Sequence, residues 1–134
     1  MTHPVAIQFR ETDLEAFADA QGRIAVVIGA EGQLSPAARR LNRLTKGALA
    51  RAVESEAFGK LKSGDALTLG WPVGVAAEAL DLVKLDARAT ISDARKAGAM
   101  IGRQLGPKGA LVLAGNHARA AEIAFGLALR AYRF

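Results

Sequence analysis

The sequence predicts an α/β fold in which a mixed sheet lies between layers of helices. Apolar runs of strand length alternate along the chain with amphipathic helical stretches, in the order β-β-α-β-β-α-β-α. One run, Ile24–Ile28, is apolar and rich in β-branched residues, which is typical of a central strand covered on both faces. Strands that alternate with helices place helices on both faces of a largely parallel or mixed sheet. We therefore expect a three-layer domain.

Length and composition fit one globular domain spanning residues 1–134. The chain has a mass of 14.0 kDa, and 51% of its residues are hydrophobic and 23% charged, which excludes a disordered class. Cysteine is absent, and this excludes disulfides, thiolate nucleophiles and cysteine metal sites.

The sequence also lacks the features of a membrane or secreted protein. The longest uncharged stretch, Ala66–Ala77, contains two glycines and a proline and falls short of the about 20 apolar residues that a spanning helix needs. Acidic residues at Glu11, Asp13 and Glu15 stand where a secretory signal would be apolar. We expect a soluble, cytoplasmic protein that makes no membrane contact.

The first third of the chain predicts two strands and a helix. Val5–Phe9 alternates as a half-buried strand does, Glu11–Ala20 suits a short acidic helix or turn, and Gly29–Gly32 closes the Ile24–Ile28 strand with a turn. Ser35 followed by Pro36 predicts a helix start, because the serine caps a free amide and proline sacrifices no hydrogen bond there. The apolar stripe of this helix is Ala37, Leu41, Leu44 and Ala48.

The remaining elements follow from similar signals. Gly47 interrupts the helix, and a second helix is expected over Ala48–Phe58. A turn at Ser63–Asp65 precedes a strand at Ala66–Leu69. Further strands are expected at Leu80–Leu85 and Leu111–Leu113, and a final helix from Ala118.

A helix that begins at Thr90 carries a glycine within its apolar stripe. Asp93 lies three residues after Thr90, close to a capping box, and Gly106–Pro107 ends the helix. The stripe consists of Ile91, Ala94, Gly98, Ile101 and Leu105. Glycine costs up to about 1 kcal/mol of helix propensity, so we expect another backbone to pack closely against Gly98.

No recognisable catalytic or metal-binding constellation is present. A zinc site needs three or four ligands, whereas the only histidines are His3 and His117. The carboxylate pairs Asp13/Glu15, Glu54/Glu56 and Asp81/Asp86 are expected on the solvated surface. Ser35 and Ser92 are explained by helix starts, and the nucleophile-elbow motif of hydrolases is absent. We therefore predict no catalytic, cofactor-binding or metal-ligating residue in this chain.

Two glycine-containing turns follow expected strands, where loops that bind phosphate often lie. Gly29–Gly32 and Gly70–Gly74 match neither the dinucleotide-binding fingerprint nor the P-loop with its lysine and hydroxyl residue. We interpret both as ordinary turns.

The net charge of +5 comes from one segment. Residues 35–51 carry five basic residues and no acid, whereas the rest of the chain holds 13 basic and 13 acidic residues. We call Arg39, Arg40, Arg43 and Lys46 the basic patch. It could contact phosphates weakly, but aromatic residues that would stack on bases are missing among them. A solvated or subunit-facing helix is the preferred interpretation.

The C-terminal stretch is unusually apolar. Ile123–Leu129 carries no charge on any helix face, and two aromatic residues, Tyr132 and Phe134, follow it. We predict that Phe125, Leu127, Leu129, Tyr132 and Phe134 cannot all face one core, and that some form an exposed apolar patch at a domain junction. The alternative is a terminal helix docked fully into its own core.

Several of these segments together resemble the N-terminal domain of the leucyl aminopeptidase (cytosol aminopeptidase) family. They are Ser35–Ala38 with the helix that follows, Gly47–Leu49, Gly64–Asp65 before a strand, the small-residue helix Ile91–Leu105, and the ending Gly126–Phe134 with its pattern Gly-x-x-Leu-x-x-Tyr-x-Phe. The resemblance covers nearly the whole chain. It implies a macro-domain-like fold, in agreement with the element order above.

The resemblance also implies what this chain does not do. The family removes N-terminal amino acids with two divalent metal ions, zinc or manganese, held in a C-terminal domain, and it assembles as a hexamer. The ligand-bearing stretch of the Asn-Thr-Asp-Ala-Glu-Gly type does not occur here. We therefore expect a non-catalytic assembly or regulatory domain whose partners are its own catalytic domain and further copies. The alternatives are an ADP-ribose-binding module that uses Gly29–Gly32 and a nucleic-acid-binding module that uses the basic patch.

Overall fold

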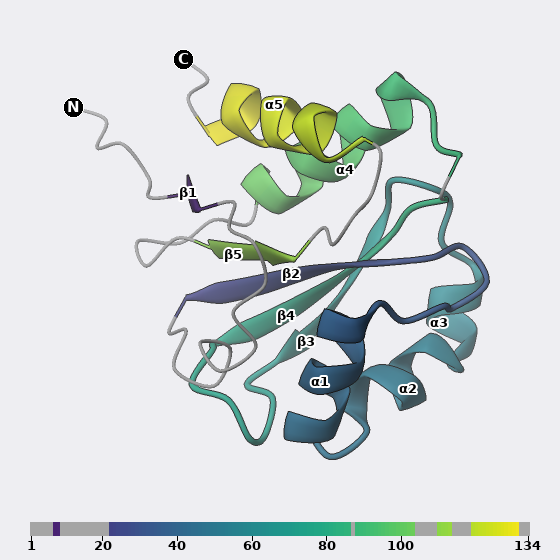
Figure 1. Ribbon diagram of the computed structural model, residues 1–134, viewed down its shortest axis with the longest axis vertical. Helices are drawn as coiled ribbons and strands as arrows, with labels where there is room; N and C mark the ends of the chain where they lie inside the picture. The colour runs from purple at the N-terminus through teal and green to yellow at the C-terminus, as the bar shows by residue number, and fades with distance from the viewer. Residues whose placement is uncertain (1–6, 9–21, 87, 104–109, 114–118, 132–134) are drawn as a thin grey trace.

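The computed structural model describes residues 7–8, 22–86, 88–103, 110–113 and 119–131. A five-stranded sheet in the order β1-β5-β2-β4-β3 lies between two groups of helices (Figure 1). Three helices cover one face, and α4 and α5 lie together on the other (Figure 1). The predicted three-layer α/β fold is confirmed.

The elements follow the predicted order. They are β1 (Ile7–Gln8), β2 (Arg23–Ile28), α1 (Pro36–Leu44), α2 (Ala48–Val53), α3 (Glu56–Gly59), β3 (Ala66–Gly70), β4 (Ala79–Lys84), α4 (Ile91–Arg103), β5 (Ala110–Leu113) and α5 (Ala120–Ala131). The expected helix over Ala48–Phe58 is wrong in one respect, because it is divided into α2 and α3. Ser55 starts α3, since its Oγ accepts a hydrogen bond from the Phe58 amide at 3.2 Å. The expectations for Glu11–Ala20 and Gly106–Pro107 lie outside the described residues.

Strand β2 lies at the centre of the sheet. It pairs in parallel with β4 on one side and with β5 on the other, and β1 pairs in parallel with β5. Strand β3 runs antiparallel to β4 at the sheet's edge, so the sheet is mixed. All five residues from Ile24 to Ile28 are buried, as expected for a strand covered on both faces.

Helix α1 begins where the sequence predicts and ends at Leu44, three residues before the predicted interruption, so that Ala48 of the predicted stripe lies in α2. Ser35 caps it, with Oγ accepting from the Ala38 amide at 3.2 Å, and Pro36 occupies the first turn. After the helix, Lys46 and Gly47 adopt left-handed backbone angles, with φ of 57° and 86°. A left-handed residue ends a helix, so the interruption at Gly47 is confirmed.

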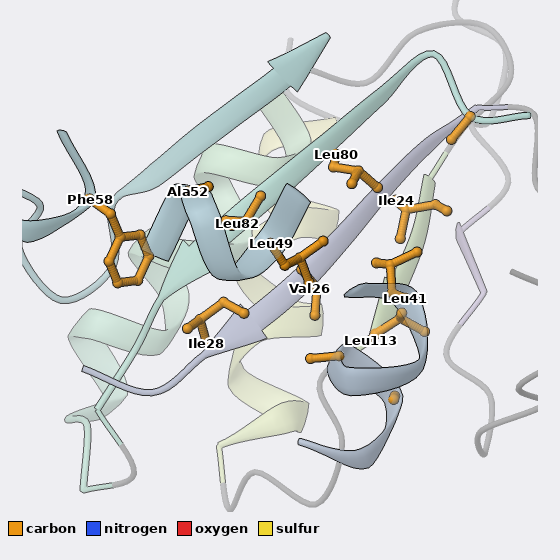
Figure 2. Packing of buried hydrophobic residues seen from close by; sticks show 13 residues of the cluster. Ile24, Val26, Ile28, Leu41, Leu49, Ala52, Phe58, Leu80, Leu82 and Leu113 are labelled. Carbon is orange, nitrogen blue, oxygen red and sulfur yellow. The ribbon is translucent and has the colours of Figure 1, made fainter. Parts of the chain in front are cut away.

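The alternation of side chains on β2 divides the core into two clusters. Ile24, Val26 and Ile28 face α1–α3, where they meet β4 leucines and the residues Leu41, Leu49 and Phe58 (Figure 2). Ala25 and Val27 face α4 and α5, where they pack in a second cluster with Val83, Ala94, Ala97, Ile101, Ile123 and Leu127. Each cluster is built from several elements of this chain, so we expect the chain to fold without a partner.

Helices α4 and α5 are in close contact. A β-carbon on Gly98 would collide with the Ile123 carbonyl and lie 2.7 Å from the Leu127 amide nitrogen. The close backbone approach predicted at Gly98 is confirmed.

Candidate functional site

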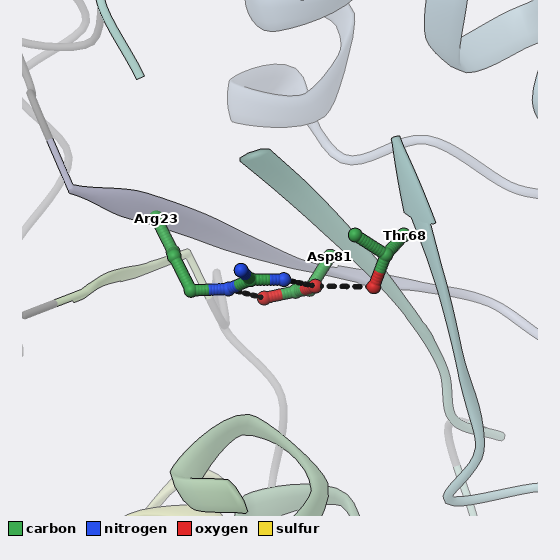
Figure 3. A network of polar contacts seen from close by, with 3 residues as sticks. All are labelled: Arg23, Thr68 and Asp81. Carbon is green, nitrogen blue, oxygen red and sulfur yellow. Dashed lines mark hydrogen bonds and ion pairs between the residues drawn. The ribbon is translucent and has the colours of Figure 1, made fainter. Parts of the chain in front are cut away.

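A buried polar network crosses three neighbouring strands of the sheet (Figure 3). Arg23 donates from Nε to Asp81 Oδ2 at 3.0 Å and from Nη2 to Asp81 Oδ1 at 2.7 Å. The Thr68 hydroxyl donates to the same Oδ1 at 2.6 Å. Asp81 is only 1% exposed, so this ion pair is held largely away from water.

Strand register explains why these three residues meet. Asp81 on β4 lies opposite Ala25 of β2 and opposite Thr68 of β3. Arg23 is two residues before Ala25 and so shares its face of the sheet. The guanidinium reaches diagonally to the carboxylate on the α4–α5 side of the sheet.

The burial of Asp81 corrects the prediction that the Asp81/Asp86 pair is solvated. That prediction rested on how rarely acidic residues are buried, but helices cover both faces of β4. A buried carboxylate needs a cation, and the matching signal was Arg23 at the start of the β-branched run. Sequence reasoning did not connect the two residues.

The network is suited to fixing strand register. Hydrogen bonding to Asp81 raises the pKa of Arg23 despite its partial burial, so the guanidinium stays charged. The carboxylate accepts from both the guanidinium and a hydroxyl. We therefore assign the network to the architecture of the sheet.

The other described members of the predicted carboxylate pairs lie on the surface, as predicted. Glu54, Glu56 and Asp86 are exposed, and Glu56 forms an exposed ion pair with Lys60 at 3.4 Å. The described residues contain no group of three or more histidines, cysteines or carboxylates that could hold a metal ion. That part of the chain does not fit a metal centre. His3, His117, Asp13 and Glu15 lie outside the described residues.

The Gly29–Gly32 turn uses its own amides. Gly29 donates to the Gln33 carbonyl at 3.2 Å, and Gly32 donates to the Gly29 carbonyl at 2.8 Å. The Glu31 amide donates to Gln33 Oε1 at 3.3 Å. A phosphate-binding loop directs free amides at its ligand, so this geometry favours the interpretation as an ordinary turn.

The basic patch divides into exposed and half-buried members. Arg39 and Arg43 are one turn apart on α1 and exposed, and Lys46 is exposed after the end of that helix. Arg40 is half-buried, and its Nε is buried without a hydrogen-bond partner in the described structure. Arg51 donates to the Lys46 carbonyl at 2.8 Å and so braces the turn after α1. The patch thus presents fewer free cations than its sequence suggests.

Among the described residues, large apolar side chains are exposed on α5 and in the loop after β3, and Ile91 at the start of α4 is 43% exposed. On α5, Ile123 and Leu127 are buried while Phe125 is 45% exposed, which confirms that the apolar residues of this helix do not all face one core. The Leu129, Tyr132 and Phe134 side chains lie outside the described set. The second place was missed by sequence reasoning, because Trp71 and Val73, in the loop after β3, are 76% and 57% exposed.

These observations define a three-layer α/β domain with a structural ion pair at its centre and, in its described part, no metal-ligand cluster. Over its full 134 residues the chain is 59% identical to a protein from Cereibacter sphaeroides named "Probable cytosol aminopeptidase". It is 56% identical over the same length to a protein of that name from Dinoroseobacter shibae. The resemblance is confirmed: the chain matches the N-terminal domain of the cytosol aminopeptidase family.

The match covers a minor part of those proteins. The chain spans 27% of the Cereibacter protein and 28% of the Dinoroseobacter protein. No family model matches the chain. Among the described residues, no helix is both long and apolar enough to cross a lipid bilayer.

Proposed function

We propose that residues 1–134 form a single, non-catalytic domain of a leucyl aminopeptidase and serve its assembly or regulation. The observation that carries the proposal is the full-length match to proteins named cytosol aminopeptidase, of which the chain spans only about a quarter. The lack of a metal-ligand cluster in the described residues supports a role without catalysis.

The proposal places the peptidase chemistry in the rest of the longer protein. There, two divalent metal ions, zinc or manganese, would serve the removal of N-terminal amino acids from peptides. Our chain would contact that catalytic domain and further copies within an oligomer, a hexamer by resemblance to the family. The relatives' name supports a cytoplasmic location.

The assembly role is tested by a segment exchange in the Cereibacter relative. One variant lacks the matching segment, and a chimera carries our chain in its place. Light scattering is expected to find fewer subunits per particle for the deletion variant and the parental number of subunits for the chimera. A deletion variant with the parental number of subunits would contradict an assembly role.

Binding of ADP-ribose is the second candidate function, and the turn geometry argues against it. The Gly29, Glu31 and Gly32 amides are engaged within their own turn, so a pyrophosphate would have to displace those hydrogen bonds. Calorimetry with ADP-ribose is expected to show no binding. Stoichiometric binding at micromolar concentration would make a nucleotide-binding module the better proposal.

Nucleic-acid binding is the third candidate, and the basic patch supports only a weak form. Arg39, Arg43 and Lys46 are its exposed cations, and so few phosphate contacts give only weak binding, which salt weakens further. Titration with duplex DNA at physiological salt is expected to show little binding. Tight binding that is lost on Arg39→Glu with Arg43→Glu would favour this function instead.

A further inference from the structure

The loop between β3 and β4 presents the two most exposed large apolar side chains of the described residues. Trp71 is 76% exposed and Val73 57% exposed, and they are separated by one proline. Trp71 also has a φ of 50°, a left-handed conformation that is uncommon for a bulky residue. The fold therefore holds a tryptophan outward in a strained backbone conformation.

The loop is fixed at several points. The Trp71 amide donates to the Glu78 carbonyl at 2.8 Å, and the Glu78 amide donates to the Gly22 carbonyl at 2.9 Å. Gly74, with φ of 82°, packs so closely on the Leu44 carbonyl at the end of α1 that a side chain there would collide with it. Ala77 is buried. The exposed pair therefore stands on a pre-organised support, which lowers the entropic cost of docking.

Phe125, the other exposed aromatic side chain among the described residues, is already engaged within this chain. The guanidinium of Arg95 lies 4.5 Å from the centre of the Phe125 ring, and Arg95 Nε pairs with Glu122 at 2.9 Å. An ion pair thus covers part of the Phe125 ring. Trp71 lies within the uncharged stretch Ala66–Ala77, so the residues that adjoin it in the sequence carry no charge. Exposed apolar side chains such as Trp71 and Val73 suit an apolar protein pocket better than a phosphate backbone, which is bound by cations.

We propose that Trp71 and Val73 dock the domain onto the remaining part of the aminopeptidase polypeptide. This rests on the proposed function, since nearly three quarters of each relative's length lies outside the segment that our chain matches. Buried tryptophans are among the residues that contribute most to protein–protein binding. The rigid loop supplies the anchor, and the rest of the polypeptide supplies the pocket.

The test measures the reactivity of Trp71 by hydroxyl-radical footprinting with mass spectrometry. Trp71 is the chain's single tryptophan, so its peptide is identified without ambiguity in the isolated chain. The second sample is the chimera in which our chain replaces the matching segment of the Cereibacter relative. The third is the isolated chain mixed with the relative that lacks this segment. We expect Trp71 oxidation to fall about tenfold or more in the chimera or the mixture, as for an anchor at the centre of an interface.

Variants give a second readout. In the chimera, Trp71→Ser with Val73→Ser is expected to raise the rate of proteolytic release of the domain about tenfold, because the undocked linker becomes accessible. Ile91→Ser, at the start of α4 where Ile91 is 43% exposed, is the matched control and is expected to leave that rate unchanged. In the isolated chain, the Trp71 and Val73 changes are expected to leave thermal stability unchanged.

The remaining outcomes separate the docking from the proposed function. If Trp71 stays equally reactive in both the chimera and the mixture, the docking is overturned, and the proposed function stands if the chimera is an active peptidase. An inactive chimera with a protected Trp71 contradicts the proposed function alone. Protection of Trp71 in the isolated chain, caused by raising its concentration or by adding DNA, would also overturn the docking in favour of self-association or nucleic-acid binding.

Discussion

Gly98 and Gly126 bring the backbones of α4 and α5 into direct contact. A β-carbon at Gly98 would meet the Ile123 carbonyl, and one at Gly126 would meet the Arg95 carbonyl, so each helix places a glycine against the other's backbone. Because both obstacles are backbone atoms, neither can be relieved by rotating a side chain. The two glycines therefore set the separation of the helices that cover one face of the sheet.

Alanine at either glycine is expected to destabilise the protein. Gly98→Ala or Gly126→Ala should lower the free energy of unfolding by about 1–3 kcal/mol, because the helices must move apart. Chemical denaturation measures this change. Gly59→Ala is the control, since nothing lies within 4 Å of that position, and it should be neutral or stabilising by up to about 1 kcal/mol. Equal effects at all three positions would show that close helix contact is unimportant.

Removal of one member of the buried ion pair is expected to cost much more than removal of both. Asp81→Ala should destabilise by about 3–5 kcal/mol because it leaves Arg23 without its buried carboxylate. Replacing Asp81 and Arg23 together by leucine should cost less than that single change. A double-mutant cycle in denaturant measures the coupling.

The exposed Glu54 is the control for Asp81. Glu54→Ala should stay within about 0.5 kcal/mol of the parent protein, as surface changes usually do. If Asp81→Ala were equally mild, the ion pair would not be a determinant of the sheet.

Asp65 is expected to contribute stability that depends on pH. The Lys62 amide donates to its carboxylate at 3.1 Å, and Lys96 lies 3.1 Å from the other oxygen, which together lower the pKa of Asp65. Because the folded-state pKa lies below the unfolded value, this stability is present above about pH 4 and is lost as the pH falls through the folded-state pKa. Thermal unfolding from pH 7 to pH 2 should therefore show a smaller acid-induced decrease for Asp65→Asn. The exposed Glu54→Gln is the control, and identical pH profiles for Asp65→Asn and the parent would contradict the assignment.

The sequence was sufficient to predict the layers of the fold because its signals are local. Ser35 and Pro36 predict a helix start, and the apolar run at Ile24–Ile28 predicts a strand covered on both faces, without reference to distant residues. Gly98 was also interpretable, since a costly glycine in an apolar stripe implies close packing. The division of the expected second helix at Ser55 depended on a capping bond that the apolar pattern does not reveal.

The candidate sites were harder to predict because they depend on tertiary pairing. Asp81 looked like a surface residue until β2 brought Arg23 onto the same face of the sheet, 58 positions away in sequence. Likewise, Trp71 lies in an uncharged stretch that could equally have been buried, whereas the structure leaves its side chain 76% exposed. Neither relationship is encoded in residue spacing along one element.

The most direct test of the account measures the release of leucine from an N-terminal leucine amide. Three samples are compared with added zinc or manganese: the isolated chain, the Cereibacter relative, and the relative carrying our chain in place of its matching segment. We predict no turnover by the isolated chain and metal-dependent turnover by both longer proteins. Metal-dependent turnover by the isolated chain, retained after contaminating peptidases have been excluded, or an inactive chimera beside an active relative, would contradict the claim that this chain is a non-catalytic domain of such an enzyme.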